Sequence, residues 1–273
     1  MPAPALALAG IDFSCHPSRR KPITIATGWL DGPRLAVAGV AEVATLAAFE
    51  DWLQTPGPWL GGFDFPFGLP RAFVDAHAFG NDAAAVIAAV RRRCPTRLAW
   101  REFIDVWGNT RPAGARLLHR RTDVASAVTS TSPMQTRYVP VGLMYYEGVA
   151  RLVDAGVTIP ALGHGGDPAR IALEAYPRRL AHALVGRRSY KNNALDDRHA
   201  AREAIVAGLE TGRAQFGFAL ACAPALRAAL LDDASGDRLD AVLCLAQAAI
   251  ASTRERYGAP DDVDPIEGWI AAE

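Results

Sequence analysis

Hydrophobic runs in the first quarter of the chain are separated by turn signals, in a pattern that predicts strands around one helix. Three apolar runs of strand length come first, at residues 6–13, 23–30 and 34–40. Asp31-Gly32-Pro33 is a turn signal between the last two runs. Apolar side chains then recur at helical spacing over 43–53, and a buried strand at 59–63 ends at Asp64. The pattern predicts an antiparallel three-stranded meander followed by a helix and a fourth strand.

The rest of the chain is mostly helical by pattern. Between about 71 and 165, helical pieces are separated by polar loops containing Pro and Gly, which predicts a helical insertion. A strand at 170–175 then resumes the sheet. Later helices are predicted at 199–211, 224–231 and 237–256. We therefore predict a single α/β domain over 1–273, with a mixed five-stranded sheet (three antiparallel strands, then parallel strands) flanked by helices.

Five acidic residues stand at the ends of these predicted elements: Asp12, Asp64, Glu174, Asp237 and Asp240. Acids at the ends of adjacent strands converge on one point, where their mutual repulsion is unfavourable unless a cation binds. Oxygen ligands without His or Cys neighbours suit Mg²⁺ or Mn²⁺. The sequence thus predicts a metal site that uses all five, and such ions support phosphodiester hydrolysis.

Each acid taken alone also fits a local role. Asp12 and Asp64 are placed to cap or to form turns, and Asp237 is placed to cap the N-terminus of the last helix. Asp237 and Asp240 are three residues apart on one helix face, where like charges repel. Some other group is therefore expected to compensate their charge.

Four segments resemble the signatures of a known family: Gly10-Ile11-Asp12-Phe13-Ser14, Gly62-Phe63-Asp64-Phe65-Pro66-Phe67-Gly68-Leu69-Pro70, Glu174-Ala175-Tyr176-Pro177 and Asp237-Arg238-Leu239-Asp240-Ala241. In order and placement they resemble the domain-of-unknown-function 429 family, predicted nucleases of the RNase H-like superfamily. The last segment also resembles the final helix of the Holliday junction resolvases in that superfamily. The resemblance implies an RNase H-like fold in which Asp12 is the central metal ligand and the other four acids complete the site. Asp64 replaces the longer Glu of the resolvase pattern and Glu174 is an additional acid, so which of the two bridges metals is left open.

The zero net charge hides a strong segregation of charge along the chain. Residues 91–137 hold ten Arg and three acids, whereas residues 230–273 hold ten acids and three basic residues. Residues 178–191 hold five basic residues and no acid. Neutrality therefore does not exclude a polyanionic partner, and we expect a basic surface beside an acidic, metal-loaded centre.

Basic and aromatic residues in these segments are candidates for contact with a nucleic acid. Arg137 and Lys191 are the leading candidates for phosphate binding, followed by Arg121, because Arg and Lys bind backbone phosphates. Tyr138 and Tyr190 are candidates for stacking on unpaired bases.

The sequence thus predicts a metal-dependent nuclease that hydrolyses RNA or DNA by a two-metal carboxylate mechanism. Two alternatives stay open: an actin- or sugar-kinase-like phosphotransferase, and a non-catalytic nucleic-acid-binding module of the same fold. Four scattered Cys without a Cys-x-x-Cys pair suit a reducing cytoplasm, and no apolar run approaches the roughly 20 residues of a membrane helix. We accordingly expect a cytoplasmic protein without a membrane partner.

Overall fold

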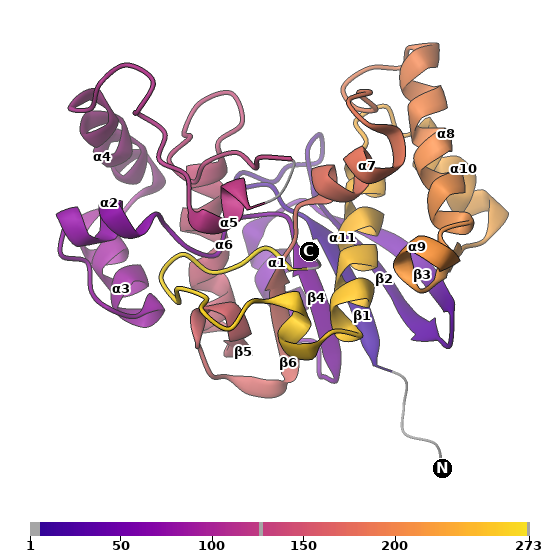
Figure 1. Ribbon diagram of the computed structural model, residues 1–273, viewed down its shortest axis with the longest axis horizontal. Coiled ribbons are helices and arrows are strands. Elements are labelled where there is room, and N and C mark those ends of the chain that lie inside the picture. The colour runs from indigo at the N-terminus through magenta and orange to yellow at the C-terminus, as the bar shows by residue number, and fades with distance from the viewer. Residues whose placement is uncertain (1–5, 126–127, 272–273) are drawn as a thin grey trace.

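The computed structural model describes residues 6–125 and 128–271, with a mixed seven-stranded sheet at the centre (Figure 1). In spatial order the strands are β5 (Val157–Thr158), β6 (Asp167–Glu174), β4 (Trp59–Phe63), β1 (Ala7–Asp12), β2 (Ile23–Asp31), β3 (Arg34–Val43) and β7 (Ala219–Ala221). The first three strands along the chain form the predicted antiparallel meander, and β4 and β6 continue the sheet in parallel with β1. The sequence predicted five strands. The two additional strands, β5 and β7, have two and three residues and lie at the sheet edges, so they are too short to give a periodic pattern.

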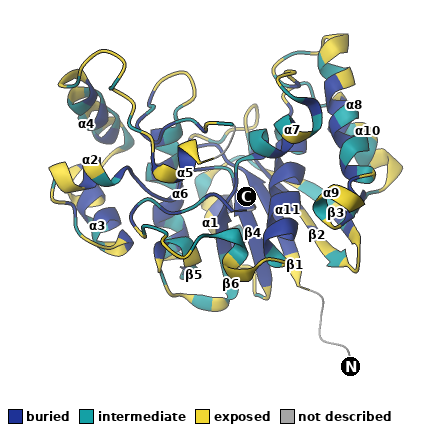
Figure 2. Cartoon of the chain, viewed as in Figure 1, coloured by how far each residue is buried: buried dark blue, intermediate teal, exposed yellow. Residues whose placement is uncertain are grey.

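Helices cover both faces of the sheet. The core cluster of one face contains residues of α1 (Leu46–Leu53), α2 (Arg71–Ala76), α3 (Ala83–Arg93), α4 (Arg97–Asn109) and α6 (Val141–Asp154), and the short helix α5 (Arg121–Val124) precedes α6. On the other lie α7 (Pro177–Val185), α8 (Asp196–Glu210), α9 (Arg213–Phe216), α10 (Pro224–Asp232) and α11 (Asp237–Ser252). Figure 2 shows that α11 is buried along nearly its whole length. The apolar residues of alternate strand positions divide accordingly into two core clusters, one on each face.

The predicted helical insertion corresponds to the chain between β4 and β6. This segment contains α2 to α6, β5 and a 3₁₀ turn, η1 (Pro160–Leu162). Among the residues that the structure describes, no helix is long and apolar enough to cross a membrane.

Acidic residues near the end of the chain contact the insertion. We call residues 259–271, which follow the 3₁₀ turn η2 (Glu255–Gly258), the C-terminal segment. Asp264 and Asp262 of this segment form ion pairs with Arg71 and Arg121, the latter at 2.6 Å. The Glu267 carboxylate accepts from the backbone N–H groups of the same two arginines, at 2.8 and 2.7 Å. The C-terminal segment therefore lies against the insertion through paired charges.

Two glycines allow α11 to lie directly on the sheet. A Cβ added to Gly10 of β1 would lie 2.1 Å from the Ala241 carbonyl oxygen and 2.1 Å from the Leu245 nitrogen. A Cβ added to Gly62 of β4 would lie 2.5 Å from the Cys244 carbonyl oxygen. Both distances are far below van der Waals contact, so only glycine permits this approach of helix and strands.

Replacing Gly10 by Ala is expected to destabilise the protein by about 3 kcal/mol or more, because α11 must move off β1 to make room for the methyl group. Gly39→Ala is the matched control, since a Cβ at that glycine meets nothing within 4 Å. Urea unfolding of the two variants measures the difference. Equal stability of both would contradict the close contact between α11 and β1.

Candidate metal centre

Three carboxylates converge where β1 and β4 end and α11 begins. Asp12 is the last residue of β1, Asp64 follows β4 directly, and Asp240 lies in the first turn of α11. One carboxylate oxygen from each lies within 4.8 Å of the others. Such a spacing allows a single cation to contact all three.

The strand register explains how the first two carboxylates meet. β1 and β4 are parallel with Ile11 opposite Phe63, and the Asp64 N–H donates to the Ile11 carbonyl at 2.9 Å. Residues two apart on a strand share a face, so Asp12 lies on the same face of β1 as Gly10, which is the face that α11 covers. The repeated Gly-x-Asp of β1 and β4 thus combines the glycine that admits α11 with the acid that meets its first turn.

Asp240 is held by two neighbouring residues of the loop between α7 and α8. The Tyr190 hydroxyl donates to Asp240 Oδ1 at 2.7 Å, and Lys191 Nζ forms an ion pair with Oδ2 of the same carboxylate. Burial raises the pKa of the Tyr190 phenol, so the hydroxyl keeps its proton and acts as a donor. Lys191 is the compensating charge that the Asp237 and Asp240 pair required.

The convergence of carboxylates opposes their ionisation. Burial, reinforced by Glu174 and Asp237, raises the pKa of Asp64 to about 6, although Lys191 acts in the opposite direction. Burial, reinforced by Asp64 and Asp237, raises the pKa of Asp12 well above its ordinary value against the same opposing effect of Lys191. Both acids are therefore at an energetic disadvantage as anions in the absence of a bound cation.

Asp12 is buried without a partner. It is 8% exposed, and among the described residues none donates a hydrogen bond to its carboxylate or forms an ion pair with it. Thr24, its register partner on β2, is 1% exposed, and its hydroxyl is a buried atom without a hydrogen-bond partner in the part of the chain that the structure describes. Buried polar atoms without partners are rare in folded proteins and indicate a site for an ion or water. The sequence analysis missed Thr24, because nothing in the pattern distinguishes it from other strand threonines.

These pKa shifts predict how the stability of the metal-free protein depends on pH. Because Asp64 has a higher pKa in the folded chain than in the unfolded chain, the folded state binds more protons between pH 4 and pH 6, and the free energy of unfolding falls as the pH rises through that window. We expect Asp64→Asn to remove this loss, of about 2 kcal/mol, when unfolding is measured in EDTA at pH 4.5 and pH 7. A stability difference between wild type and variant that is equal at both pH values would contradict the assignment.

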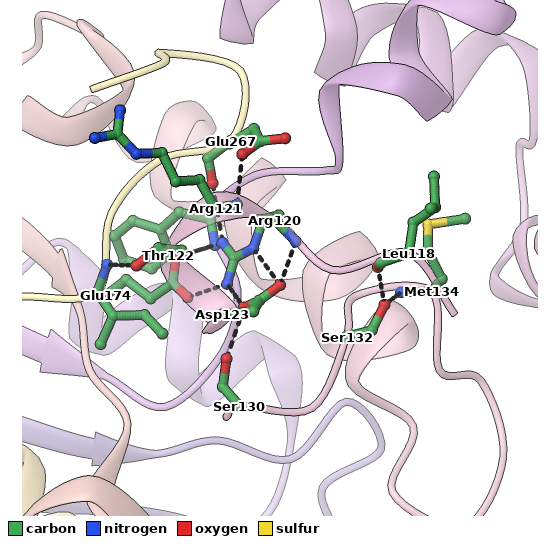
Figure 3. A network of polar contacts seen from close by, with 12 residues as sticks. Leu118, Arg120, Arg121, Thr122, Asp123, Ser130, Ser132, Met134, Glu174 and Glu267 are labelled. Atoms are coloured by element: carbon green, nitrogen blue, oxygen red, sulfur yellow. Dashed lines mark hydrogen bonds and ion pairs between the residues drawn. The ribbon is translucent and has the colours of Figure 1, made fainter. Parts of the chain in front are cut away.

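Glu174, predicted as a metal ligand, lines the same cavity as Asp64 and Asp240 but is not one of the three carboxylates that converge. It is in register with Phe63 and not with Asp64, so it faces the opposite side of the sheet. Figure 3 shows its carboxylate facing the Arg120 guanidinium, which donates to its two oxygens at 2.6 and 2.8 Å. Arg120 also pairs with Asp123 at 2.8 Å, and all three side chains are almost completely buried. Glu174 thus belongs to a buried ion network that joins β6 to the insertion.

Asp237 also lies outside the three-carboxylate group. It begins α11 and lines a separate cavity with Thr24 and Arg238, although its charge still acts on Asp12 and Asp64. The predicted centre of five carboxylates is therefore a centre of three in the structure.

Most of the predicted phosphate-binding residues are engaged in other contacts. Arg137 pairs with Asp105 at 2.7 Å, and Arg121 pairs with Asp262. Tyr138 is fully exposed, next to Val139 of the cavity described below. Only Lys191 of the predicted set contacts the carboxylates. Tyr190 is bonded to Asp240 and is only 2% exposed, so its ring is not available to stack on a base.

A cavity of about 350 Å³ opens beside the carboxylates. Its lining contains the acids Asp64, Asp240 and Glu174 and the basic side chains Lys191, Arg178 and Arg120. Its other wall is largely apolar: Phe65, Pro66, Val139, Val141 and Met144. Arg178 was not singled out in the sequence, although it belongs to the basic stretch that contains Lys191. The cavity thus places acidic, basic and apolar surfaces within one small volume, which suits a ligand with an anionic group and an apolar part.

Comparison with protein-family models, with curated proteins and with solved structures found no match for this chain.

Proposed function

We propose that this protein is a metal-dependent nuclease that hydrolyses phosphodiester bonds in RNA or DNA. The observation that carries the proposal is the convergence of Asp12, Asp64 and Asp240, with the Asp12 carboxylate buried and without a partner. Clusters of carboxylates whose pKa values are raised by burial and by one another are typical of functional sites.

The donor set fits Mg²⁺ or Mn²⁺, because it supplies oxygen atoms only and the three carboxylates are held within reach of one ion. Asp12, Asp64 and Asp240 would hold the ion. When bound, such an ion lowers the pKa of a water molecule and stabilises the charge that develops on phosphate oxygens. Three ionised carboxylates concentrate negative charge that a divalent cation offsets.

The cavity supports a phosphate ester as the substrate. Arg178 and Lys191 supply positive charge for phosphate oxygens beside the carboxylates, and the apolar wall offers contact area for a base or sugar. A fold of the RNase H-like type is part of the proposal. It is supported by the antiparallel meander β1–β3, by the parallel β4 and β6, and by the sequence resemblance to the domain-of-unknown-function 429 family.

A cleavage assay tests the function. Labelled single-stranded, duplex and four-way-junction nucleic acids are incubated with the protein in Mn²⁺, in Mg²⁺ and in EDTA. We expect cleavage of at least one of them that stops in EDTA, that is lost in Asp64→Asn and that is kept in Asp51→Asn, which changes an exposed acid on α1.

Wild-type protein that leaves all of these substrates uncut in Mn²⁺ would contradict the proposal. Saturable ATP binding with transfer of phosphate would favour the phosphotransferase alternative. Tight binding of nucleic acid without cleavage would favour a non-catalytic module.

A further inference from the structure

Lys191 places an ammonium group where the carboxylates converge. Its Nζ is paired with Asp240, a side chain that is only 2% exposed. Lys191 is also the first among the groups that favour ionisation of Asp12 and Asp64. A single side-chain cation therefore stabilises the negative charge of all three proposed metal ligands.

The backbone next to Lys191 is fixed, whereas its side chain is accessible. Arg202 is 1% exposed and donates to the Tyr190 carbonyl at 2.8 Å and to the Leu231 carbonyl at 2.6 Å. The Tyr190 hydroxyl is in turn bonded to Asp240. The Lys191 side chain is 29% exposed, and the residue after it, Asn192, is exposed. The ammonium can therefore change partners by rotation of a flexible side chain on a fixed backbone.

A second partner for this ammonium would lie in the same cavity. Lys191 and Arg178 both line it. Among the described residues Arg178 forms no ion pair, and its guanidinium donates to the Arg188 carbonyl at 3.3 Å. The third basic residue of the lining, Arg120, is already paired with Asp123 and Glu174. Arg178, which has no acidic partner among the described residues, and Lys191, which shares its acid with the proposed metal site, together suit a phosphate anion.

We propose that Lys191 is a built-in cation that occupies the carboxylate site in the metal-free protein, leaves Asp240 when a divalent cation is bound, and then binds the substrate phosphate together with Arg178. This inference rests on the proposed function. Release of Lys191 from Asp240 frees the carboxylate for the metal and the ammonium for the phosphate. Binding of the metal and binding of the phosphodiester therefore strengthen each other by the same factor.

The affinity for Mn²⁺, measured by electron paramagnetic resonance of the free ion, tests this exchange without reference to catalysis. It is determined with and without dimethyl phosphate, a phosphodiester anion that has no base. The variants are Lys191→Met, which removes the charge, and Lys191→Arg, which keeps it. Lys21→Met is the matched control, since Lys21 is the only other lysine, is exposed, and also acts electrostatically on Asp12.

We expect Lys191→Met to bind Mn²⁺ about tenfold more tightly than wild type, with Lys191→Arg and Lys21→Met within about threefold of it. Dimethyl phosphate should tighten Mn²⁺ binding in wild type but not in Lys191→Met. Unchanged or weaker Mn²⁺ binding in Lys191→Met, or coupling that persists in it, would overturn the exchange while leaving the metal site intact. If neither wild type nor Lys191→Met binds Mn²⁺, the proposed function fails as well.

Discussion

Replacement of Asp12 by Asn is expected to abolish Mn²⁺ binding and to slow metal-dependent cleavage by about 10³-fold, while it stabilises the metal-free protein. The rate loss corresponds to several kcal/mol of metal-dependent stabilisation. The gain in stability follows because Asn carries no charge at the position where burial and neighbouring carboxylates disfavour the Asp12 anion. Residues that are needed for activity often lower the stability of the folded protein.

Cleavage rates in Mn²⁺ and urea unfolding in EDTA at pH 7 measure the two effects on the same protein. Asp237→Asn is the matched control, because that acid lies on the same helix turn as Asp240 but outside the three-carboxylate group. It should retain activity within about tenfold of wild type. An Asp12→Asn protein that binds Mn²⁺ with wild-type affinity would rule out the site.

Replacement of Arg120 by Met is expected to lower the free energy of unfolding by about 3 to 5 kcal/mol, which is a large part of the roughly 5 to 15 kcal/mol that stabilises a typical domain. The guanidinium is 1% exposed and is bonded to both Glu174 and Asp123. Its removal leaves two buried carboxylates without a counter-charge. Urea unfolding followed by circular dichroism measures the loss.

The neighbouring arginine provides a control for this variant. Arg121 is more than half exposed and pairs with the exposed Asp262, so Arg121→Met should lower the stability far less than Arg120→Met. The double variant Arg120→Met with Glu174→Gln should regain part of the loss, because one of the two unpaired charges is then absent. Equal stability of the Arg120 and Arg121 variants would contradict the role of the buried network.

The carboxylates of β1, β4 and α11 could be predicted from sequence because each is tied to a local pattern. Strand-length apolar runs end at Asp12 and Asp64, and helical spacing places Asp240 in the first turn of α11. The glycine two residues before each strand acid has a physical reason that the structure reveals, namely contact with the α11 backbone. Predictions from such local patterns hold in the structure because each depends on a single strand or helix.

Glu174 could not be assigned correctly, because its face depends on the register of two strands more than a hundred residues apart in the chain. A shift of one residue moves a side chain to the opposite face. Glu174 is paired with Phe63, so the acid at the end of the third parallel strand faces the insertion. Its true partner, Arg120, lies 54 residues earlier in the chain, in a segment with no regular pattern.

Part of the segregated charge is used in contacts within the molecule. We predicted that the arginines of the insertion would form a phosphate-binding surface beside an acidic centre. In the structure Arg121, one of the ten arginines of 91–137, pairs with Asp262, and Arg71, earlier in the insertion, pairs with Asp264, so these two acids of the C-terminal segment contact the insertion. These ion pairs place part of the segregated charge in contacts within the molecule, and the basic residues that line the cavity are Arg178 and Lys191 of the stretch 178–191 and Arg120 of the insertion.

The central claim is that Asp12, Asp64 and Asp240 form a site for a divalent cation. A crystal structure of the protein in Mn²⁺, with anomalous scattering recorded near the manganese edge, tests it most directly. The account predicts an anomalous peak within bonding distance of all three carboxylates, with Glu174 still paired to Arg120. A peak absent from this position, or one centred on Glu174 without Asp12, would contradict it.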